Sequence, residues 1–308
     1  MVATPQPQDR PEQLSADFKA VLAVRRLFGK PDVAAAQADP AAARARTARF
    51  IASFATPGAL PRDPADGDGS VGPVRFRRFP TNGAHRVPGQ VIYVHGGGLV
   101  FHDLDCFAPV LAGWAAAGRS IVGLDYPKAP ETKPASIVAA VTGAIAALAE
   151  TGDEPLVLAG DSIGGLLVLH AALTALAERR PRLVLIHPVL NLDDSRSFPS
   201  YEQFGEGYLL DRDFMAWFRA LARQGMPPGF DPLALTPGQA ALLGEIRLVS
   251  AACDMLADEA RLFAGQLRTL GVLVDHTVLG GMPHDFILFT QRLLSAQKMV
   301  EQTSRIFS

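Results

Sequence analysis

Short apolar runs alternate with longer runs over most of the chain. Runs of strand length cover residues 90–94, 120–124, 155–159, 182–187, 245–252 and 272–279, and runs of helical length cover 104–117, 134–149, 256–270 and the stretch from 285. Strands and helices that alternate at this spacing predict an α/β fold with a mostly parallel sheet and helices on both faces. In such a fold, ligands bind at the carboxyl ends of the strands.

Three segments depart from this alternation. Residues 1–55 contain two patches of helical apolar spacing, which either cover the body of the fold or line a substrate site. Residues 61–72, rich in Pro, Gly and Asp, predict a loop before an exposed strand at 74–79. From 191 to 239 aromatic residues gather on a helical stripe that either packs a small cap or contacts a substrate. The candidates for substrate contact are Phe204, Tyr208, Leu209 and Phe214.

Composition narrows the classes of protein to consider. The chain has 308 residues, of which 48% are hydrophobic and 19% charged, as expected of a packed enzyme rather than a disordered chain. A net charge of -2 without a long basic stripe argues against nucleic acid or an anionic membrane as partner. We expect a cytoplasmic protein, because no apolar stretch is long enough to span a bilayer, no signal peptide is recognisable and two cysteines fit a reducing compartment.

The stretch 155–172 joins a strand to a helix through Gly160-Asp161-Ser162-Ile163-Gly164. In a G-x-S-x-G arrangement of this kind the serine occupies a sharp, strained turn, and the glycines let strand and helix approach closely. The backbone N–H of Ile163 starts the helix without an intrahelical partner and is free to face a developing oxyanion. Ser162 is therefore a candidate nucleophile.

Three glycines follow the strand 90–94 directly, in His95-Gly96-Gly97-Gly98. Such a run costs backbone entropy unless the main chain must approach another group closely. We interpret the run as part of an oxyanion hole. A phosphate-binding loop is the alternative, but its Lys-Ser/Thr ending and its G-x-G-x-x-G spacing are both missing from the sequence.

A serine nucleophile needs a histidine base, and that base needs a carboxylate; both are expected later in the chain, the acid first. Asp254 follows the strand 245–252 and is the candidate acid, whereas Asp258 and Glu259 suit the first turn of the next helix. His284 is the candidate base, since it alone of the seven histidines follows the last strand in a glycine-rich loop.

Five separated motifs now agree in order and spacing: His95-Gly96-Gly97-Gly98, Asp125-Tyr126 with Ala129-Pro130-Glu131, Gly160-Asp161-Ser162-Ile163-Gly164-Gly165, Asp254 with Leu256, Asp258 and Glu259, and Met282 with His284-Asp285-Phe286. From about residue 90 onwards the chain resembles the hormone-sensitive-lipase-like branch of α/β-hydrolase carboxylesterases. The resemblance implies the α/β-hydrolase fold, with Ser162 as nucleophile, His284 as base and Asp254 as orienting acid. It also implies oxyanion donors from the backbone N–H groups of Gly97, Gly98 and Ile163.

The same resemblance implies a division of the chain. Residues 1–55 and 191–239 would form a helical cap over the acyl and alcohol pockets, and 56–190 and 240–308 would form the two parts of the hydrolase core. No cofactor or metal is implied. Two positions depart from the family pattern: Ile163 stands where alanine is usual and is placed to narrow the pocket, and Pro127-Lys128 replaces the more usual Arg-Leu.

We therefore expect hydrolysis of short-chain acyl or aryl esters through an acyl-enzyme, by a monomer or homodimer whose partner is a small-molecule ester. An amidase, a lactonase or an acyltransferase would use the same triad, because all share the tetrahedral intermediate. A non-catalytic small-molecule receptor could also use this fold. A structural protein would leave the three glycines without a purpose.

Overall fold

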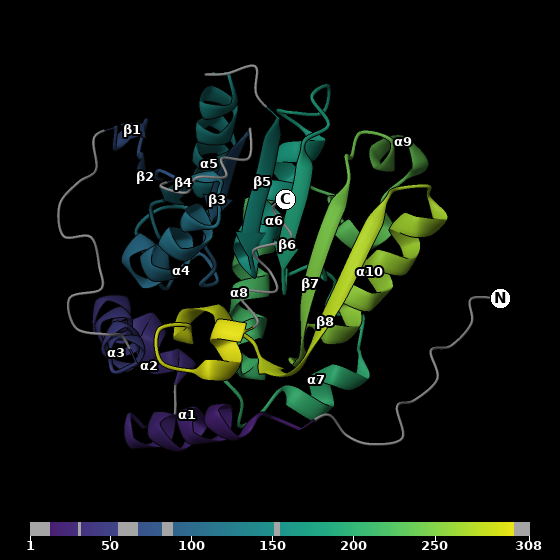
Figure 1. Ribbon diagram of the computed structural model, residues 1–308. Helices are drawn as coiled ribbons and strands as arrows, with labels where there is room; N and C mark the ends of the chain where they lie inside the picture. The colour runs from purple at the N-terminus through teal and green to yellow at the C-terminus, as the bar shows by residue number, and fades with distance from the viewer. Residues whose placement is uncertain (1–12, 30–31, 55–66, 82–88, 151–154, 299–308) are drawn as a thin grey trace.

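An eight-stranded sheet runs through the computed structural model, which describes residues 13–29, 32–54, 67–81, 89–150 and 155–298 (Figure 1). The strand order is β1-β2-β4-β3-β5-β6-β7-β8. The strands are β1 (Gly69–Val71), β2 (Val74–Phe79), β3 (Gln90–Val94), β4 (Ser120–Asp125), β5 (Leu156–Asp161), β6 (Arg182–Ile186), β7 (Ile246–Cys253) and β8 (Val274–Pro283). All neighbours from β4 to β8 are parallel, whereas β2 pairs antiparallel with β4 and with β1, so the predicted mostly parallel sheet is confirmed.

Helices connect the parallel strands and also form a group at one end of the sheet. Those that follow strands of the sheet include α4 (Leu104–Ala116), α5 (Pro134–Ala149), α6 (Ile163–Leu173) and α10 (Ala257–Thr269). The remaining helices and 3-10 turns are α1 (Ala16–Leu27), α2 (Val33–Ala38), α3 (Pro40–Ala52), α7 (Pro199–Phe204), α8 (Arg212–Gly225), η1 (Pro232–Ala234), α9 (Pro237–Ala240) and η2 (Phe286–Phe289). No helix in the described ranges has the length and apolar character needed to cross a bilayer.

Both faces of the sheet are buried. Alternate residues of β3 point to opposite faces, so Val91 and Tyr93 join one apolar cluster while Ile92 and Val94 join the other. The first cluster includes residues of α1, α3, α4 and η2, and the second includes residues of α5, α6, α8 and α10. Continuously apolar strands of this kind are typical of parallel sheets covered on both sides. Their carboxyl ends are therefore held rigidly in place.

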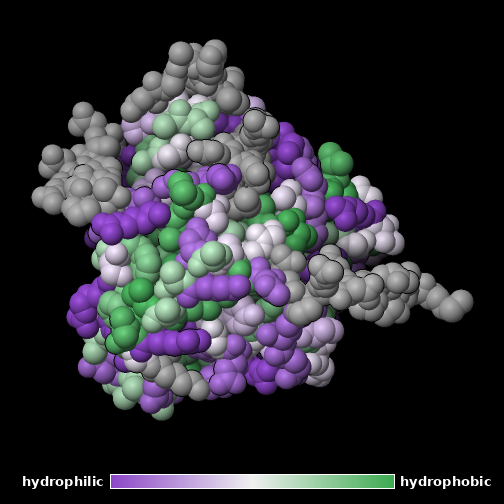
Figure 2. Space-filling view, turned by 60° about the horizontal axis from the view of Figure 1, so that its bottom comes forward, coloured by the Kyte–Doolittle hydropathy of each residue, from purple (hydrophilic) through white to green (hydrophobic). Residues whose placement is uncertain are grey.

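Helices α1, α2, α3 and α7 lie in the lower part of Figure 1, with α2 and α3 packed against each other on the left and α7 on the right. An ion pair of 2.8 Å between Arg25 and Asp211 joins α1 to the segment that precedes α8. This end of the molecule comes forward in Figure 2, where hydrophilic and hydrophobic residues are interspersed over the surface. The division into a core and a cap at residues 55, 190 and 239 stays a prediction.

The first helix is tied to the end of the described chain. The backbone N–H of Ser15 donates to the carbonyl of Gly281, at 3.0 Å, and the carboxylate of Asp17 accepts hydrogen bonds from the backbone N–H and the hydroxyl of Ser295. The ring of Phe18 packs edge-on against Phe289, with centroids 5.7 Å apart. Helix α1 and Ser15 before it therefore contact residues that precede His284 in the chain and residues that follow it.

Several boundaries differ from those expected from sequence. Strand β8 continues to Pro283, because it still pairs with β7 across residues expected to form a loop. A 3-10 turn, η2, replaces the start of the helix expected from residue 285. The chain becomes α-helical again only at Leu294. Strand β1 lies within the expected loop 61–72, of which residues 61–66 fall outside the described ranges. The short helix α2 was not expected; the carboxylate of Asp32 caps it by accepting from the N–H groups of Ala34 and Ala35.

Candidate active site

Ser162 sits in a strained turn between β5 and α6. Its φ of 50° and ψ of -120° are unfavourable for a residue with a Cβ atom. The start of α6 packs directly against β3, since a Cβ on Gly164 would lie 2.0 Å from the carbonyl oxygen of Val94. This close approach of helix and strand requires the sharp turn at Ser162. The N–H of Ser162 donates to the carbonyl of Ile186 at 3.0 Å, which anchors the turn to β6.

The three residues predicted as a triad form one chain of hydrogen bonds. Nδ1 of His284 donates to Oδ2 of Asp254 at 2.7 Å, and Nε2 of the same ring lies 3.1 Å from the Ser162 hydroxyl. The other oxygen of Asp254 accepts from the backbone N–H of Leu256 at 3.0 Å. All three side chains are buried, with residual exposures between 2% and 6%. With Nδ1 protonated, Nε2 has a lone pair directed at the serine hydroxyl.

Strand register explains why the acid and the base meet. Cys253, the last residue of β7, is aligned with Pro283, the last residue of β8. The residues that follow them, Asp254 and His284, therefore leave neighbouring parallel strands at the same level. An irregularity between Ala251 and Cys253 achieves this alignment, because β8 has three residues, 280–282, opposite the single residue 252 of β7.

The electrostatic surroundings of His284 favour its protonated form. Burial opposes a charge on the ring, but the carboxylates of Asp254 and Asp285 outweigh it and raise the pKa of His284 to about 9. Asp285 contributes through an oxygen that lies 3.6 Å from Nε2. The site thus stabilises the imidazolium that a general base becomes when it takes a proton.

The three predicted oxyanion donors have free backbone N–H groups. Within the described ranges, no acceptor is found for the N–H of Gly97, Gly98 or Ile163. Gly97 and Gly98 line the same pocket as Ser162 and His284. Gly97 has φ 108° and lies so close to Phe101 that a Cβ would be 2.2 Å from its carbonyl oxygen, so only glycine fits there.

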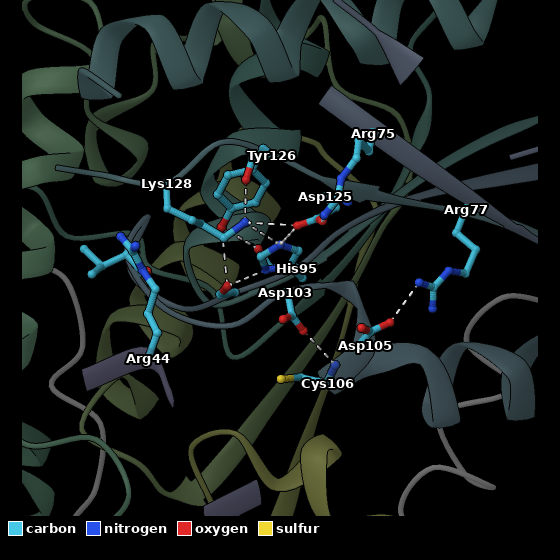
Figure 3. Close-up of polar contacts among 12 residues, drawn as sticks. Arg44, Arg75, Arg77, His95, Asp103, Asp105, Cys106, Asp125, Tyr126 and Lys128 are labelled. Carbon is cyan, nitrogen blue, oxygen red and sulfur yellow. Dashed lines mark hydrogen bonds and ion pairs between the residues drawn. The ribbon is translucent and has the colours of Figure 1, made fainter. Parts of the chain in front are cut away.

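His95, Asp125, Tyr126 and Lys128 form a polar cluster that contacts the glycine loop, residues 96–98 (Figure 3). The His95 ring donates from Nδ1 to the carbonyl of Gly96 at 2.7 Å and stacks on Tyr126, with centroids 4.4 Å apart. Lys128 donates to Nε2 of His95 and to the Asp125 carboxylate, both at 3.2 Å. Burial and the nearby Lys128 ammonium lower the pKa of His95 to about 4, so its ring is neutral. The Lys128 that departs from the family pattern therefore has a place in this cluster.

A second buried contact holds the loop from the serine side. Oδ1 of Asp161 accepts from the Tyr93 hydroxyl at 2.5 Å and from the backbone N–H of Gly96 at 2.8 Å. Complete burial raises the pKa of Asp161 to about 7, although both hydrogen bonds favour its ionised form. The residue before Ser162 thus fixes the start of the glycine loop.

A pocket of about 1000 Å³, its open mouth included, leads from the protein surface to Ser162 and His284. Of the predicted substrate-contact residues, Leu209 and Phe214 line it. Phe204 and Tyr208 do not; they pack edge-on against each other, with centroids 5.2 Å apart. The side chain of Ile163 is also absent from the lining, because it is fully buried in the core, so the narrowing expected from it does not occur.

Sequence reasoning did not single out the pocket residues contributed by α1 and α3. They are Arg25 from α1 and Ala43, Arg46, Thr47, Phe50 and Ile51 from α3. The signal was present in part, since positions 43, 46, 47, 50 and 51 follow the i, i+3, i+4, i+7, i+8 spacing of one helix face. Arg46 and Thr47 are polar, so an apolar spacing alone does not identify this helix face.

One grouping of possible metal ligands occurs in the described part of the chain. His187, His284 and Asp285 bring ligand atoms within 4.8 Å of one another. Both ring nitrogens of His284 already take part in hydrogen bonds, to Asp254 and to Ser162. The geometry therefore assigns His284 to the serine rather than to a metal ion.

Comparison with known proteins agrees with this arrangement. The family described as the α/β-hydrolase fold matches residues 91–288. The ethyl acetate hydrolase of Pseudomonas putida is 30% identical over 237 residues, which are 71% of this chain and 73% of that protein. Carboxylesterase NlhH of Mycobacterium tuberculosis is 33% identical over 222 residues, 65% of this chain and 66% of that protein.

Solved structures extend the comparison to nearly the whole chain. The crystal structure of a thermostable esterase from Pseudomonas putida superposes with a TM-score of 0.78 at 23% identity, covering 96% of this chain and 97% of that one. At this identity the likeness concerns the fold alone. Fold, family match and sequence relatives together show that the chain belongs to the α/β-hydrolase family, in its hormone-sensitive-lipase-like branch of carboxylesterases.

Proposed function

We propose that this protein is a serine carboxylesterase that hydrolyses short-chain acyl or aryl esters. The observation that carries the proposal is the hydrogen-bonded chain from Asp254 through His284 to Ser162. Its order and distances suit a nucleophile, a general base and an orienting acid. The names of the sequence relatives, an ethyl acetate hydrolase and a carboxylesterase, support an ester as the substrate.

In the proposed mechanism the Ser162 oxygen attacks the ester carbonyl carbon while Nε2 of His284 takes the hydroxyl proton. The carbonyl oxygen becomes an oxyanion, for which the N–H groups of Gly97, Gly98 and Ile163 are the proposed donors. The imidazolium then gives its proton to the departing alkoxide, which leaves an acyl-enzyme. Water attacks the acyl carbonyl with His284 again as base, and the acid product leaves as Ser162 recovers its proton.

Short acyl or aryl groups suit the pocket because aromatic side chains form much of its wall. Phe28, Phe50, Phe101, Phe214 and Phe289 are among its lining residues. We also propose that the helices of residues 1–55 and 191–239 act as the cap of this pocket. Cytoplasmic location and a monomeric or homodimeric state stay predictions.

The test is hydrolysis of p-nitrophenyl esters from acetate to palmitate by the purified protein. Turnover should be highest on short chains, and Ser162→Ala should lower kcat by about 10⁴-fold to 10⁶-fold. A loss smaller than about tenfold would remove Ser162 from the mechanism. Turnover that increases toward palmitate would contradict the short-chain proposal while leaving the esterase assignment in place.

A further inference from the structure

Helix α3 forms one wall of the pocket described above, and this wall includes the positively charged side chain of Arg46. Residues Ala43, Arg46, Thr47, Phe50 and Ile51 of this helix face the pocket. Phe50 and Ile51 are buried and apolar, whereas Arg46 is half-buried. Charged side chains normally lie on the solvent face of a helix, so the position of Arg46 on the pocket-facing side needs an explanation.

Arg46 has no acidic partner among the residues that the structure describes, whereas Arg44 and Arg25 each have one. Arg44, two residues earlier on α3, donates to both oxygens of Glu131 at 2.8 Å and to the carbonyl groups of Val100 and Ala129. The other arginine of the pocket, Arg25, pairs with Asp211 at 2.8 Å. Hydrogen bonds and ion pairs therefore account for the charge of Arg44 and Arg25 but not for that of Arg46.

A half-buried guanidinium that has no partner in the described ranges has lost part of its hydration and gained no ion pair there in return. That cost is offset when an anion enters the pocket. A guanidinium offers a planar fork of N–H donors that matches the two oxygens of a carboxylate. The missing partner of Arg46 is thus best supplied by a carboxylate on the bound ligand.

A negative charge beside the catalytic histidine gives such a ligand a direction. Asp285 also lines the pocket, and its carboxylate lies 3.6 Å from Nε2 of His284. It repels a second carboxylate from the reacting end. A substrate with one ester and one carboxylate would therefore present its ester to Ser162 and its negative charge to α3.

We propose that the preferred substrates are esters that carry a carboxylate away from the scissile bond, and that Arg46 binds this carboxylate. The inference rests on the proposed esterase function and adds the substrate class. Arg46 acts as a specificity residue and takes no part in the chemistry. Its contribution should therefore appear mainly in KM, since it binds substrate and transition state alike.

The test uses two carboxylate esters, each compared with the neutral compound in which a primary amide replaces the carboxylate. Monomethyl adipate carries its carboxylate on the acyl side, and 4-acetoxybenzoate carries it on the alcohol side. Hydrolysis is followed by pH-stat titration for the wild type, for Arg46→Gln and for Arg49→Gln. Arg49 is the matched control, because it is an exposed arginine in the last turn of the same helix.

For at least one pair, we expect the wild type to show a kcat/KM about tenfold higher for the carboxylate than for the amide. Arg46→Gln should abolish this preference, because kcat/KM falls far more for the carboxylate than for the amide compound, while Arg49→Gln should retain the preference. High salt should weaken it, because it is electrostatic.

Equal hydrolysis of carboxylate and amide in both pairs would overturn the inference and leave the esterase function intact. A preference that survives in Arg46→Gln would overturn it as well. Turnover of none of the four compounds by folded protein would instead overturn the proposed function, and this inference with it.

Discussion

The imidazole of His187 packs against that of His284, with ring centroids 4.3 Å apart and ring planes tilted by 54°. His187 is buried and has φ 33°, and neither of its ring nitrogens has a hydrogen-bond partner among the described residues. Burial and the adjacent His284 ring hold the pKa of His187 well below its usual range. His187 is therefore a neutral ring that fills the space beside His284.

Replacing His187 with asparagine should lower kcat about tenfold with little change in KM, because asparagine tolerates the positive φ but is too short to hold the His284 ring in place. The measurement is steady-state hydrolysis of p-nitrophenyl acetate, with circular dichroism to verify folding. His276→Asn, on strand β8, is the control. Unchanged kcat in His187→Asn would show that Asp254 alone orients the base.

The pH dependence of kcat/KM should reflect the raised pKa of His284. A general base must be neutral to accept a proton, so activity should increase as the pH rises toward about 9. Asp285→Asn removes a negative charge that stabilises the imidazolium and should move this increase to lower pH. The exposed Asp275 supplies a matched control, Asp275→Asn, which should leave the profile in place. Identical profiles for wild type and Asp285→Asn would refute the role of Asp285.

Two glycine-to-alanine changes should have opposite effects on stability. Gly164→Ala places a Cβ 2.0 Å from a backbone oxygen and should destabilise the protein by several kcal/mol, with loss of activity. Gly143 lies inside α5 with open space around it, so Gly143→Ala should stabilise by about 0.5–1 kcal/mol. Thermal unfolding of both variants decides the matter, and a normal melting temperature for Gly164→Ala would contradict the packing described here.

Lys128→Met should lower kcat about tenfold while KM changes little, because the His95 ring loses a donor and the glycine loop loses its support. Hydrolysis kinetics with a short p-nitrophenyl ester provide the measurement. Lys133→Met is the control, since Lys133 is exposed at the start of α5. If both variants match the wild type, the cluster around His95 serves packing alone.

Much of the site was predictable because its parts are local in sequence. The strand, turn and helix around Ser162 lie within one continuous stretch, and the two glycines beside the serine act through their own backbone. The position of His284 after the last strand could likewise be read from the alternation of strands and helices. These features depend on periodicity and turn chemistry, which a single sequence contains.

Other features depend on register and packing between distant segments. The extension of β8 to Pro283 follows from its pairing with β7, although its glycines suggest a loop. The pocket-facing position of Arg46 depends on how α3 is oriented, and Arg44 fixes that orientation through the distant Val100 and Ala129. The helical spacing within residues 40–52 places Arg46 on one face with apolar residues, but it does not say that this face meets the pocket, so the cation in the pocket could be found only in three dimensions.

The hydrogen bonds between the start of α1 and the C-terminal part of the chain limit how the N-terminus of the enzyme can be changed. Ser15 and Asp17 bind residues on either side of His284 in the chain, so the first helix braces the segment that carries the base as well as the pocket. A chimaera that borrows this helix from a relative would need compatible partners for Gly281 and Ser295. Shortening the N-terminus should therefore impair turnover of even the smallest ester, whose binding needs little of the pocket wall.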